Sequence, residues 1–229
     1  MGFLNRQVWG RALLVAAALA VGAVCWSGCG GDDNPADNNG GNNSGNSNTG
    51  GNNNNIGGDT LSCGTRECKS AVMPDGQTWM TENLNKTTDG SWCYENSPDS
   101  CAKYGRLYTW SAAKAACQSV GMRLPTNAEW GALVTAAGGS SVAGKALKAD
   151  HGWYNNGNGT DMYGFSALPG GDWRSNGSFL YAGLSGLWWT ATEGPDGSAY
   201  SRYIDYNYDY VYEDNDYKNF GFSVRCVQN

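Results

Sequence analysis

The stretch LPTNAEWGALVTAAGG, residues 124–139, carries the clearest secondary-structure signal in the chain. Thr126 is followed three positions later by Glu129, the signature of a capping box, in which both residues satisfy main-chain N–H groups at a helix start. Apolar side chains then recur on one helical face: Trp130, Leu133 and Val134. The stretch therefore predicts a helix that begins after Thr126, packs one face on a core and ends at the pair Gly138-Gly139.

The neighbouring segments extend this prediction to a fold class. Upstream, GRLYTWSAAKAACQSVG (residues 105–121) predicts a second helix, because alanine favours helix and Gly121 can end it. DGQTWMTENLN (residues 75–85) opens with a turn and alternates like a strand. Short strand-like pieces follow at residues 164–168, 187–192, 200–206, 211–213 and 220–227. Two helices followed by many short strands predict an α+β domain with extensive loops.

The first 28 residues read as an export signal. Arg6 and Arg11 precede an apolar run over residues 12–24, and small residues follow it. The run is too short for a comfortable membrane span. The letters WSG before Cys29 resemble a bacterial lipoprotein cleavage box, which implies that Cys29 is acylated and becomes the mature N-terminus. Ordinary cleavage and a retained anchor are the alternatives. We therefore expect an exported protein, lipid-anchored at the outer membrane or cell surface.

Composition divides the rest of the chain. Residues 29–60 are almost entirely Asn, Gly, Asp, Ser and Thr, which predicts a disordered tether, with a root-mean-square reach of roughly 30 Å. Residues 61–229 are long enough for one domain with a sizeable core. The chain has 15 basic and 21 acidic residues, and loss of Arg6 and Arg11 with the signal takes the formal charge from −6 to −8. A nucleic-acid partner is therefore not expected.

Six cysteines follow Cys29, and an even set in an exported domain predicts three disulfides. The short loops CGTREC and CYENSPDSC each favour a local bridge, which leaves the last two cysteines for each other. The favoured pairing is Cys63 with Cys68, Cys93 with Cys101, and Cys117 with Cys226. The third bridge would tie a helix to the C-terminal strand.

Six motifs stand in the order and spacing of a known family: DGQTWMTENLN, CYENSPDSCAKYGRLYTW, GMRLPTNAEW, YGFSALPGG, WWTATE and GFSVRCV. Over residues 75–227 the chain thus resembles the Fibrobacter succinogenes major paralogous domain. That family is similar in turn to formylglycine-generating-enzyme domains and to the C-type-lectin-like fold. The resemblance implies an α+β domain with two helices, short twisted antiparallel strands and extensive loops, stapled here by disulfides. We interpret the motifs GMRLPTNAEW, YGFSALPGG and GFSVRC as holding the fold, with Arg123 and Arg225 as candidate partners for buried carbonyls or carboxylates.

Enzyme chemistry finds little support in the sequence. His151 is the only histidine, and no serine or cysteine stands near it in a nucleophile motif. The pair in CGTREC precedes the first shared motif, whereas formylglycine-generating enzymes carry their cysteine pair in the C-terminal half, so we interpret Cys63 and Cys68 as structural. Acidic residues are dense near the C-terminus, but no spacing sets two carboxyl groups across a cleft. We therefore predict a protein that is not an enzyme and has no cofactor.

A structural calcium ion stays open as an alternative. The loops YEDNDYKN and NNGNGTD concentrate oxygen ligands. Neither has EF-hand spacing, and the motifs of sugar-binding calcium lectins are missing. Zinc is not expected, because paired cysteines and one histidine leave no ligand set.

The stretch YIDYNYDYVYEDNDY, residues 203–217, is the candidate binding surface. Within it, Tyr206, Tyr208, Tyr210 and Tyr212 recur at every second position, so an extended segment would place these four on one face. A hairpin turn near residues 207–209 would break this stripe into two strands. Tyrosines that simply cover a half-buried sheet are the alternative. Rigid aromatic rings beside Asp and Asn suit a binding platform, which Trp188 and Trp189 would extend, with one of the two facing the core. The predicted site comprises Tyr206, Tyr208, Tyr210, Tyr212, Asp205, Asp209, Trp188 and Trp189.

Together these features predict a lipid-anchored surface module that recognises an extracellular polysaccharide or protein. A structural envelope lipoprotein without a specific ligand is one alternative. A degenerate relative of the formylglycine-generating enzymes is the other.

Overall fold

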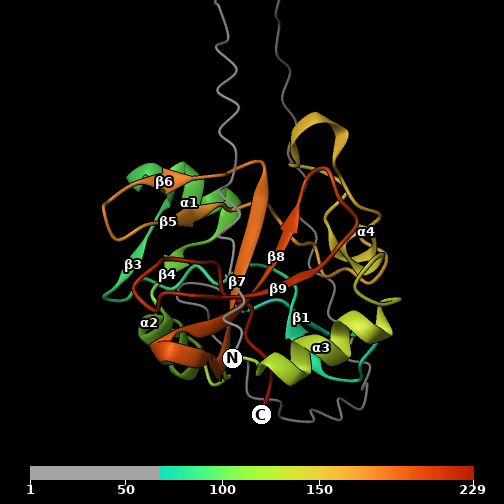
Figure 1. The fold of residues 1–229 in the computed structure, drawn as a ribbon, viewed down its shortest axis with the longest axis horizontal. Coiled ribbons are helices and arrows are strands. Elements are labelled where there is room, and N and C mark those ends of the chain that lie inside the picture. Colours follow the sequence, from blue (N-terminus) through green and yellow to red (C-terminus); the bar gives the residue numbers. More distant parts are fainter. Residues whose placement is uncertain (1–67) are drawn as a thin grey trace, which may run out of the picture. The chain divides into compact units, whose positions relative to one another are not determined.

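The computed structural model describes residues 68–229, a mixed α/β domain with four α-helices and nine strands within that range (Figure 1). The predicted signal segment, the tether, Cys29 and Cys63 lie outside the described residues. Within the described range no helix has the length and apolar character needed to cross a membrane.

The two predicted helices are present, and two shorter ones join them. The helices are α1 (Pro98–Tyr104), α2 (Trp110–Ser119), α3 (Asn127–Ala136) and α4 (Ala143–Leu147). Both predicted helices have an N-cap threonine, Thr109 for α2 and Thr126 for α3, whose side chain accepts a main-chain N–H. The expectation of only two helices is corrected, because α1 and α4 are too short for an apolar periodicity to reveal them.

The strands form small antiparallel sheets. The largest has three strands in the order β7 (Ser185–Glu193), β8 (Ala199–Asp205) and β9 (Tyr212–Asp216). Three two-stranded sheets complete the set: β1 (Ser70–Val72) with β2 (Thr78–Met80), β3 (Ser91–Trp92) with β4 (Leu107–Tyr108), and β5 (Asp172–Trp173) with β6 (Phe179–Leu180). The strands predicted at residues 187–192, 200–206 and 211–213 are confirmed as parts of β7, β8 and β9.

Two predicted strands are wrong. Residues 164–168 and 220–227 make only isolated bridges, and the second segment bridges to five different partners: Trp79, Tyr108, Arg123, Trp173 and Trp188. Its apolar pattern reflects burial among several elements at once. The C-terminal segment therefore ties the domain together without extending any one sheet.

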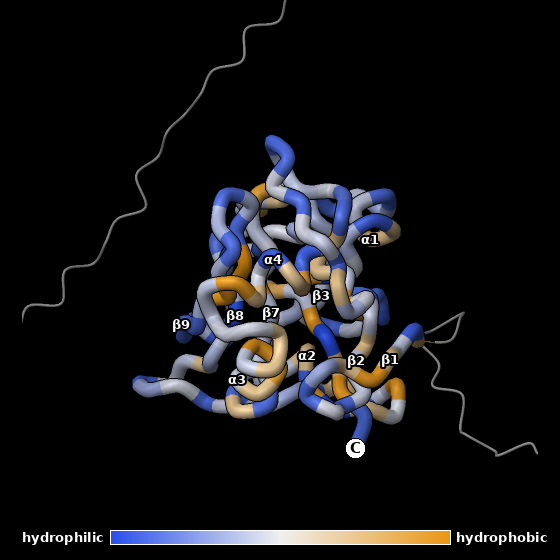
Figure 2. The backbone as a smooth tube through the Cα atoms, turned by 90° about the vertical axis from the view of Figure 1, so that its right-hand side faces the viewer, coloured by the Kyte–Doolittle hydropathy of each residue, from blue (hydrophilic) through white to orange (hydrophobic). Residues whose placement is uncertain are grey.

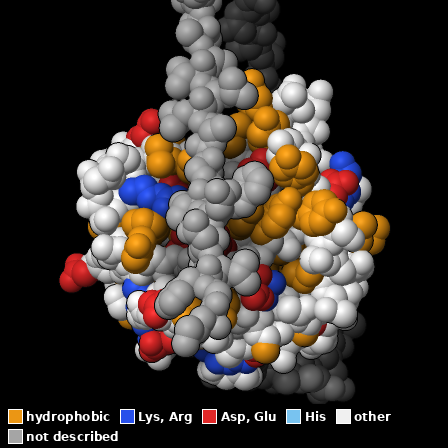
Figure 3. All heavy atoms as spheres, in the orientation of Figure 1, with side chains coloured by type: hydrophobic (Ala, Val, Ile, Leu, Met, Phe, Trp, Pro, Cys, Tyr) orange, Lys and Arg blue, Asp and Glu red, His pale blue; other side chains and the backbone are white. Residues whose placement is uncertain are grey.

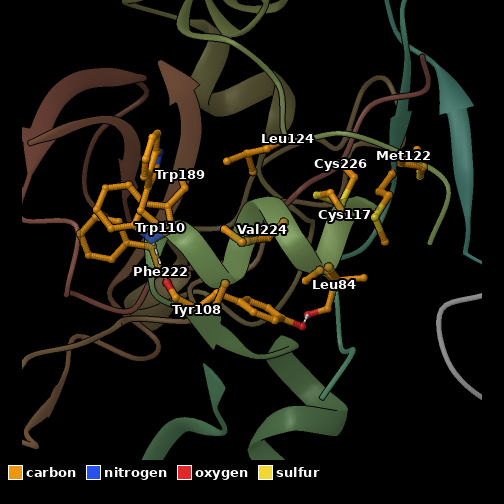
Figure 4. Close-up of a cluster of buried hydrophobic side chains, with 14 of the residues drawn as sticks. Leu84, Tyr108, Trp110, Cys117, Met122, Leu124, Trp189, Phe222, Val224 and Cys226 are labelled. Atoms are coloured by element: carbon orange, nitrogen blue, oxygen red, sulfur yellow. Dashed lines mark hydrogen bonds between the residues drawn. A yellow bond between two sulfur atoms is a disulfide. The ribbon is translucent and has the colours of Figure 1, made fainter. Parts of the chain in front are cut away.

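The apolar core consists of two clusters on opposite faces of β7. Trp189 packs in the first cluster, where α2, Phe222 and the C-terminal segment meet (Figure 4). Trp188 packs in the second cluster with Trp130 of α3 and Phe165. Successive strand residues point to opposite faces, and both faces of β7 are covered. Figure 2 shows the result: the backbone is hydrophobic along parts of α2, α3 and β2, and hydrophilic in the loops that extend past α4.

The disulfide prediction is confirmed where the structure describes both partners. Cys93 is bonded to Cys101, and Cys117 of α2 is bonded to Cys226 of the C-terminal segment. Cys68 is also disulfide-bonded, and its predicted partner Cys63 lies outside the described residues. The second bridge closes across the first core cluster, where Figure 4 draws it beside Met122.

The start of α3 combines the predicted capping box with an ion pair. Thr126 Oγ1 accepts the N–H of Glu129 at 3.2 Å, and the Glu129 carboxylate accepts the N–H of Thr126 at 2.7 Å. Arg123 donates to both carboxylate oxygens, at 2.8 and 2.5 Å. The predicted role of Arg123 as a carboxylate partner is thus confirmed. The hydrogen bonds from Arg123, and then those from Thr126, lower the pKa of Glu129 to about 2.

This pKa shift predicts a stability that depends on pH. The folded pKa of Glu129 lies below its unfolded value of about 4.3, so its contribution is complete above that value and is lost as the pH falls toward 2. With allowance for solvent screening, we expect Glu129→Gln to lower the free energy of unfolding by about 1–2 kcal/mol at pH 7 and to have little effect near pH 2. Urea unfolding at both pH values measures this.

The matched control is Glu193→Gln, which removes an exposed carboxylate paired with Lys218. We expect a much smaller loss of stability from this variant. Equal losses from the two variants at pH 7, or a Glu129→Gln loss that persists at pH 2, would contradict the assignment.

Candidate functional site

The tyrosine-rich segment folds into the hairpin of β8 and β9, with residues 206–211 as its loop. The hairpin alternative is therefore confirmed, and the continuous stripe is not formed. Tyr203 and Tyr212 face each other across the strands and their rings stack, with centroids 4.5 Å apart. The ring of Tyr210 lies against the other side of this pair, 5.5 Å from Tyr212, and Tyr208 meets Tyr212 edge-on at 6.5 Å. Three predicted tyrosines thus remain together, and Tyr203 joins them.

Tyr206 does not share that surface. Its ring is half-buried, packs against the second core cluster, and meets the ring of Tyr154 edge-on at 5.4 Å. The turn that starts at this residue rotates the chain, which separates its side chain from the next tyrosines. Tyr208 and Tyr210 are the exposed pair, with 51% and 44% of their surface accessible.

Trp188 and Trp189 do not extend the surface. Both are fully buried, and both indole N–H groups donate inside the domain, to Asn83 Oδ1 and to the carbonyl of Tyr108. The prediction that one of them faces outward is corrected. Its error was to treat the second face of β7 as open, whereas α3 and Phe165 cover it.

A pocket of about 320 Å³ lies between the hairpin loop and α4. Figure 1 shows the loop beside α4, and Figure 3 shows hydrophobic side chains gathered over this region. The pocket is lined by residues 156–158 and 206–210, with Ser141, Lys145 and Lys148. It thus combines aromatic rings, side-chain amides and charged groups, and it includes the predicted residues Tyr206, Tyr208, Tyr210 and Asp209.

Lys148 binds the loop from the interior of the domain. Its side chain is buried, and its ammonium group donates to the carbonyls of Tyr208 at 3.0 Å, Asp205 at 3.3 Å and Tyr206 at 3.5 Å. Burial lowers the pKa of Lys148, and the Asp209 carboxylate, 4.0 Å away, counteracts that shift. All three donors of the ammonium group are thereby used on one loop. The loop is consequently fixed by a buried charge.

Close backbone contacts fix the loop further. The Gly144 N–H donates to the carbonyl of Asp209, and the Val211 N–H donates to the carbonyl of Ser140, both at 2.9 Å. A Cβ at Gly144 would lie 2.6 Å from the carbonyl oxygen of Tyr210, and one at Gly157 would lie 2.2 Å from that of Tyr206. Only glycine permits this approach. The position of the loop is therefore set by contacts within the domain.

The two predicted aspartates have different environments. Asp205 accepts the hydroxyl of Ser185 at 2.9 Å, at the end of the β7–β8 pairing. Asp209 lines the pocket, and 54% of its side chain is exposed. Asp205 thus braces the hairpin, and Asp209 is the carboxylate available to a ligand.

Metal-ligand groups, cysteines and the histidine were the other candidates for a site in residues 68–229. No three His, Cys, Asp or Glu side chains lie together there as a metal-ligand set, so calcium stays a prediction without a geometric counterpart. All five cysteines in this range are disulfide-bonded. His151 is exposed, and its Nδ1 lies 2.7 Å from Asp150 Oδ1.

The comparisons identify the family. No curated protein and no solved structure is similar enough to the chain to match it. The family model of the Fibrobacter succinogenes major domain matches residues 72–228, which cover most of the chain and include the pocket and, apart from Cys68, the buried residues of both core clusters. The chain therefore belongs to the Fibrobacter succinogenes major domain family.

Proposed function

We propose that this domain is a non-enzymatic binding module that holds an extracellular polysaccharide in the pocket between α4 and the β8–β9 loop. The observation that carries the proposal is the pair of exposed rings, Tyr208 and Tyr210, on a loop fixed by buried Lys148. A fixed loop loses little conformational entropy when it binds, which favours affinity.

The chemistry of the pocket suits a sugar. Sugar rings have apolar faces that can contact tyrosine rings, and tyrosine supplies rigid area at low entropic cost. Their hydroxyl groups need donors and acceptors, which Asn156, Asn158 and Asp209 provide around the same pocket. Its volume of about 320 Å³ lies at the lower end of the range of about 300–1,000 Å³ for small-molecule sites. This favours one or two sugar units of a longer chain.

The proposal predicts a loss of binding when the exposed rings are removed. We expect Tyr208→Ala and Tyr210→Ala each to weaken binding to the best polysaccharide about tenfold, since each removes roughly 1.4 kcal/mol of ring contact. A screen of plant and bacterial polysaccharides, with and without calcium, identifies the ligand, and isothermal titration measures the change.

The control is Tyr217→Ala, which removes a tyrosine that is 72% exposed, meets the ring of Phe220 edge-on and does not line the pocket. It should bind like the wild type. Unchanged affinity in both pocket variants would refute the site. Failure of every glycan to bind would instead favour a protein partner or a structural envelope lipoprotein.

We also propose that the module is exported and attached to the membrane through an acylated Cys29. The support is the sequence of residues 1–29, with its basic start, apolar run and cysteine box. Cys29→Ser should move the protein from the membrane fraction to the soluble fraction, with Cys25→Ser as the matched control. Retention of the Cys29→Ser protein in membranes would exclude acylation at this cysteine as the anchor.

The finer fold relationship is likewise a proposal. Two ten-residue helices, α2 and α3, beside small antiparallel sheets and long loops support a C-type-lectin-like or formylglycine-generating-enzyme-like fold. An experimental structure whose chain path differs from both folds would exclude it.

A further inference from the structure

The charge of the pocket is opposite to that of the domain around it. Residues 68–229 contain 12 basic and 16 acidic side chains. The charged residues that line the pocket are Lys145, Lys148 and Asp209, two cations and one anion. Lys148 is already accounted for by its hydrogen bonds to the loop, so Lys145 is the lysine that a site for a neutral sugar leaves unexplained.

The two lysines differ in what they can offer a ligand. Lys148 is buried and its three donors are engaged by loop carbonyls. Lys145 is exposed, and within the described part of the chain it donates one hydrogen bond, to the carbonyl of Asn158 at 2.9 Å. An ammonium group has three donors. Lys145 can therefore contact a ligand, whereas Lys148 acts as a fixed charge behind it.

The two charges are close enough to interact. Burial is the main cause that lowers the pKa of Lys148, Asp209 raises it, and the positive charge of Lys145 lowers it further. The Asp209 carboxylate, 4.0 Å from the Lys148 ammonium group, raises this pKa by more than Lys145 lowers it, and Asp205 raises it as well. The two carboxylates therefore balance the charge of Lys148, and an anion placed in the pocket would be attracted mainly by Lys145.

We propose that the pocket selects a sugar unit that carries a carboxylate, that is, a uronic acid, with Lys145 as the residue that contacts the carboxylate. This inference rests on the proposed polysaccharide function and names its ligand class. The rings of Tyr208 and Tyr210 would contact the sugar, and the amides of Asn156 and Asn158 would take its hydroxyl groups.

The test compares two polymers with the same backbone. The full chain, purified in detergent, is titrated calorimetrically with polygalacturonate and with its methyl ester, in which the carboxylates are neutralised. We expect the acid form to bind about tenfold more tightly, the effect of one charge-assisted hydrogen bond. Lys145→Met should remove this preference, while Lys145→Arg should retain it.

Two controls separate this inference from general attraction of anions and from the proposed function. Lys69→Met removes one charge from a lysine that is 70% exposed and does not line the pocket. A similar loss of binding in Lys69→Met, or tighter binding of dextran sulfate than of polygalacturonate, would overturn selection of a carboxylate.

Equal binding of acid and ester by the wild type would also overturn it, and the polysaccharide function would survive if Tyr208→Ala still weakened both. Failure of the wild type to bind polygalacturonate would overturn the uronic-acid inference, and the neutral polysaccharides of the screen would then test the proposed function alone.

Discussion

Removal of the Cys117–Cys226 disulfide is expected to lower the free energy of unfolding by about 4–5 kcal/mol, against about 2–3 kcal/mol for removal of Cys93–Cys101. The first bridge spans 109 positions in the sequence and the second spans 8. In the chain-entropy account, a bridge stabilises the fold by restricting the unfolded chain, and the restriction grows with the length of the closed loop. The expected ranking therefore follows from loop length.

The measurement is urea unfolding of the two double-alanine variants under non-reducing conditions. Cys117 and Cys226 are fully buried, and Cys101 is nearly so, so both variants lose some packing, and each serves as the control for the other. Because the long bridge restricts the unfolded state, its removal should also raise the dependence of unfolding free energy on urea concentration. Equal losses, or a larger loss for the short bridge, would show that native packing and strain outweigh the entropy of the unfolded chain.

The parts of the fold that could be predicted are those set by local sequence. A capping residue fixes the start of α3, and alanines followed by Gly121 define α2. Residues 220–227 have the composition of a strand, yet their main-chain bonds are divided among several elements. That division depends on where those elements lie in space, and the sequence of residues 220–227 alone does not predict their positions.

The candidate site, like the fold, could be predicted only where local sequence sets it. The tyrosine and aspartate spacing identified the hairpin loop, because alternation is a local signal. Tyr203 could have been added from the pairing of β8 with β9, which sets it opposite Tyr212. Lys148 could not, because lysine is ordinarily exposed and its burial here depends on a loop about 60 residues later in the chain. Lys148, which fixes the loop of the site, could therefore not be identified from the sequence.

Arg225 is the second residue whose loss should have a large effect. It is fully buried and donates to the carbonyls of Met80, at 3.1 Å, of Ser166, at 2.8 Å, and of Phe165. Its Nε donates to Asn83 Oδ1 at 2.8 Å, the oxygen that also accepts the Trp188 indole N–H. The expectation that this arginine partners buried carbonyls is confirmed. One guanidinium group thereby joins the β2 end, the segment around residue 165 and the C-terminal segment.

We expect Arg225→Met to lower the free energy of unfolding by about 3–5 kcal/mol. Burial lowers the pKa of Arg225 to about 9, and the charges of Glu82 and Asp161 counteract that shift. Replacing both members of a buried ion pair with apolar residues can be neutral. This does not apply to Arg225, because three of its acceptors are main-chain carbonyls that no substitution removes. The carbonyls of Met80 and Phe165 would remain buried without their donor.

Arg225→Lys distinguishes the charge from the geometry of the donors. A lysine retains the positive charge but cannot reproduce the planar fork that reaches carbonyls in three directions, so we expect a loss between those of the wild type and Arg225→Met. Lys69→Met, at an exposed position, should change stability by less than about 0.5 kcal/mol.

An Arg225→Met protein as stable as the wild type in urea would mean that water reaches the vacated carbonyls. The C-terminal segment would then depend mainly on the Cys117–Cys226 bridge for its attachment, and the Arg225 variant combined with loss of that bridge should lose far more stability than the two changes lose separately.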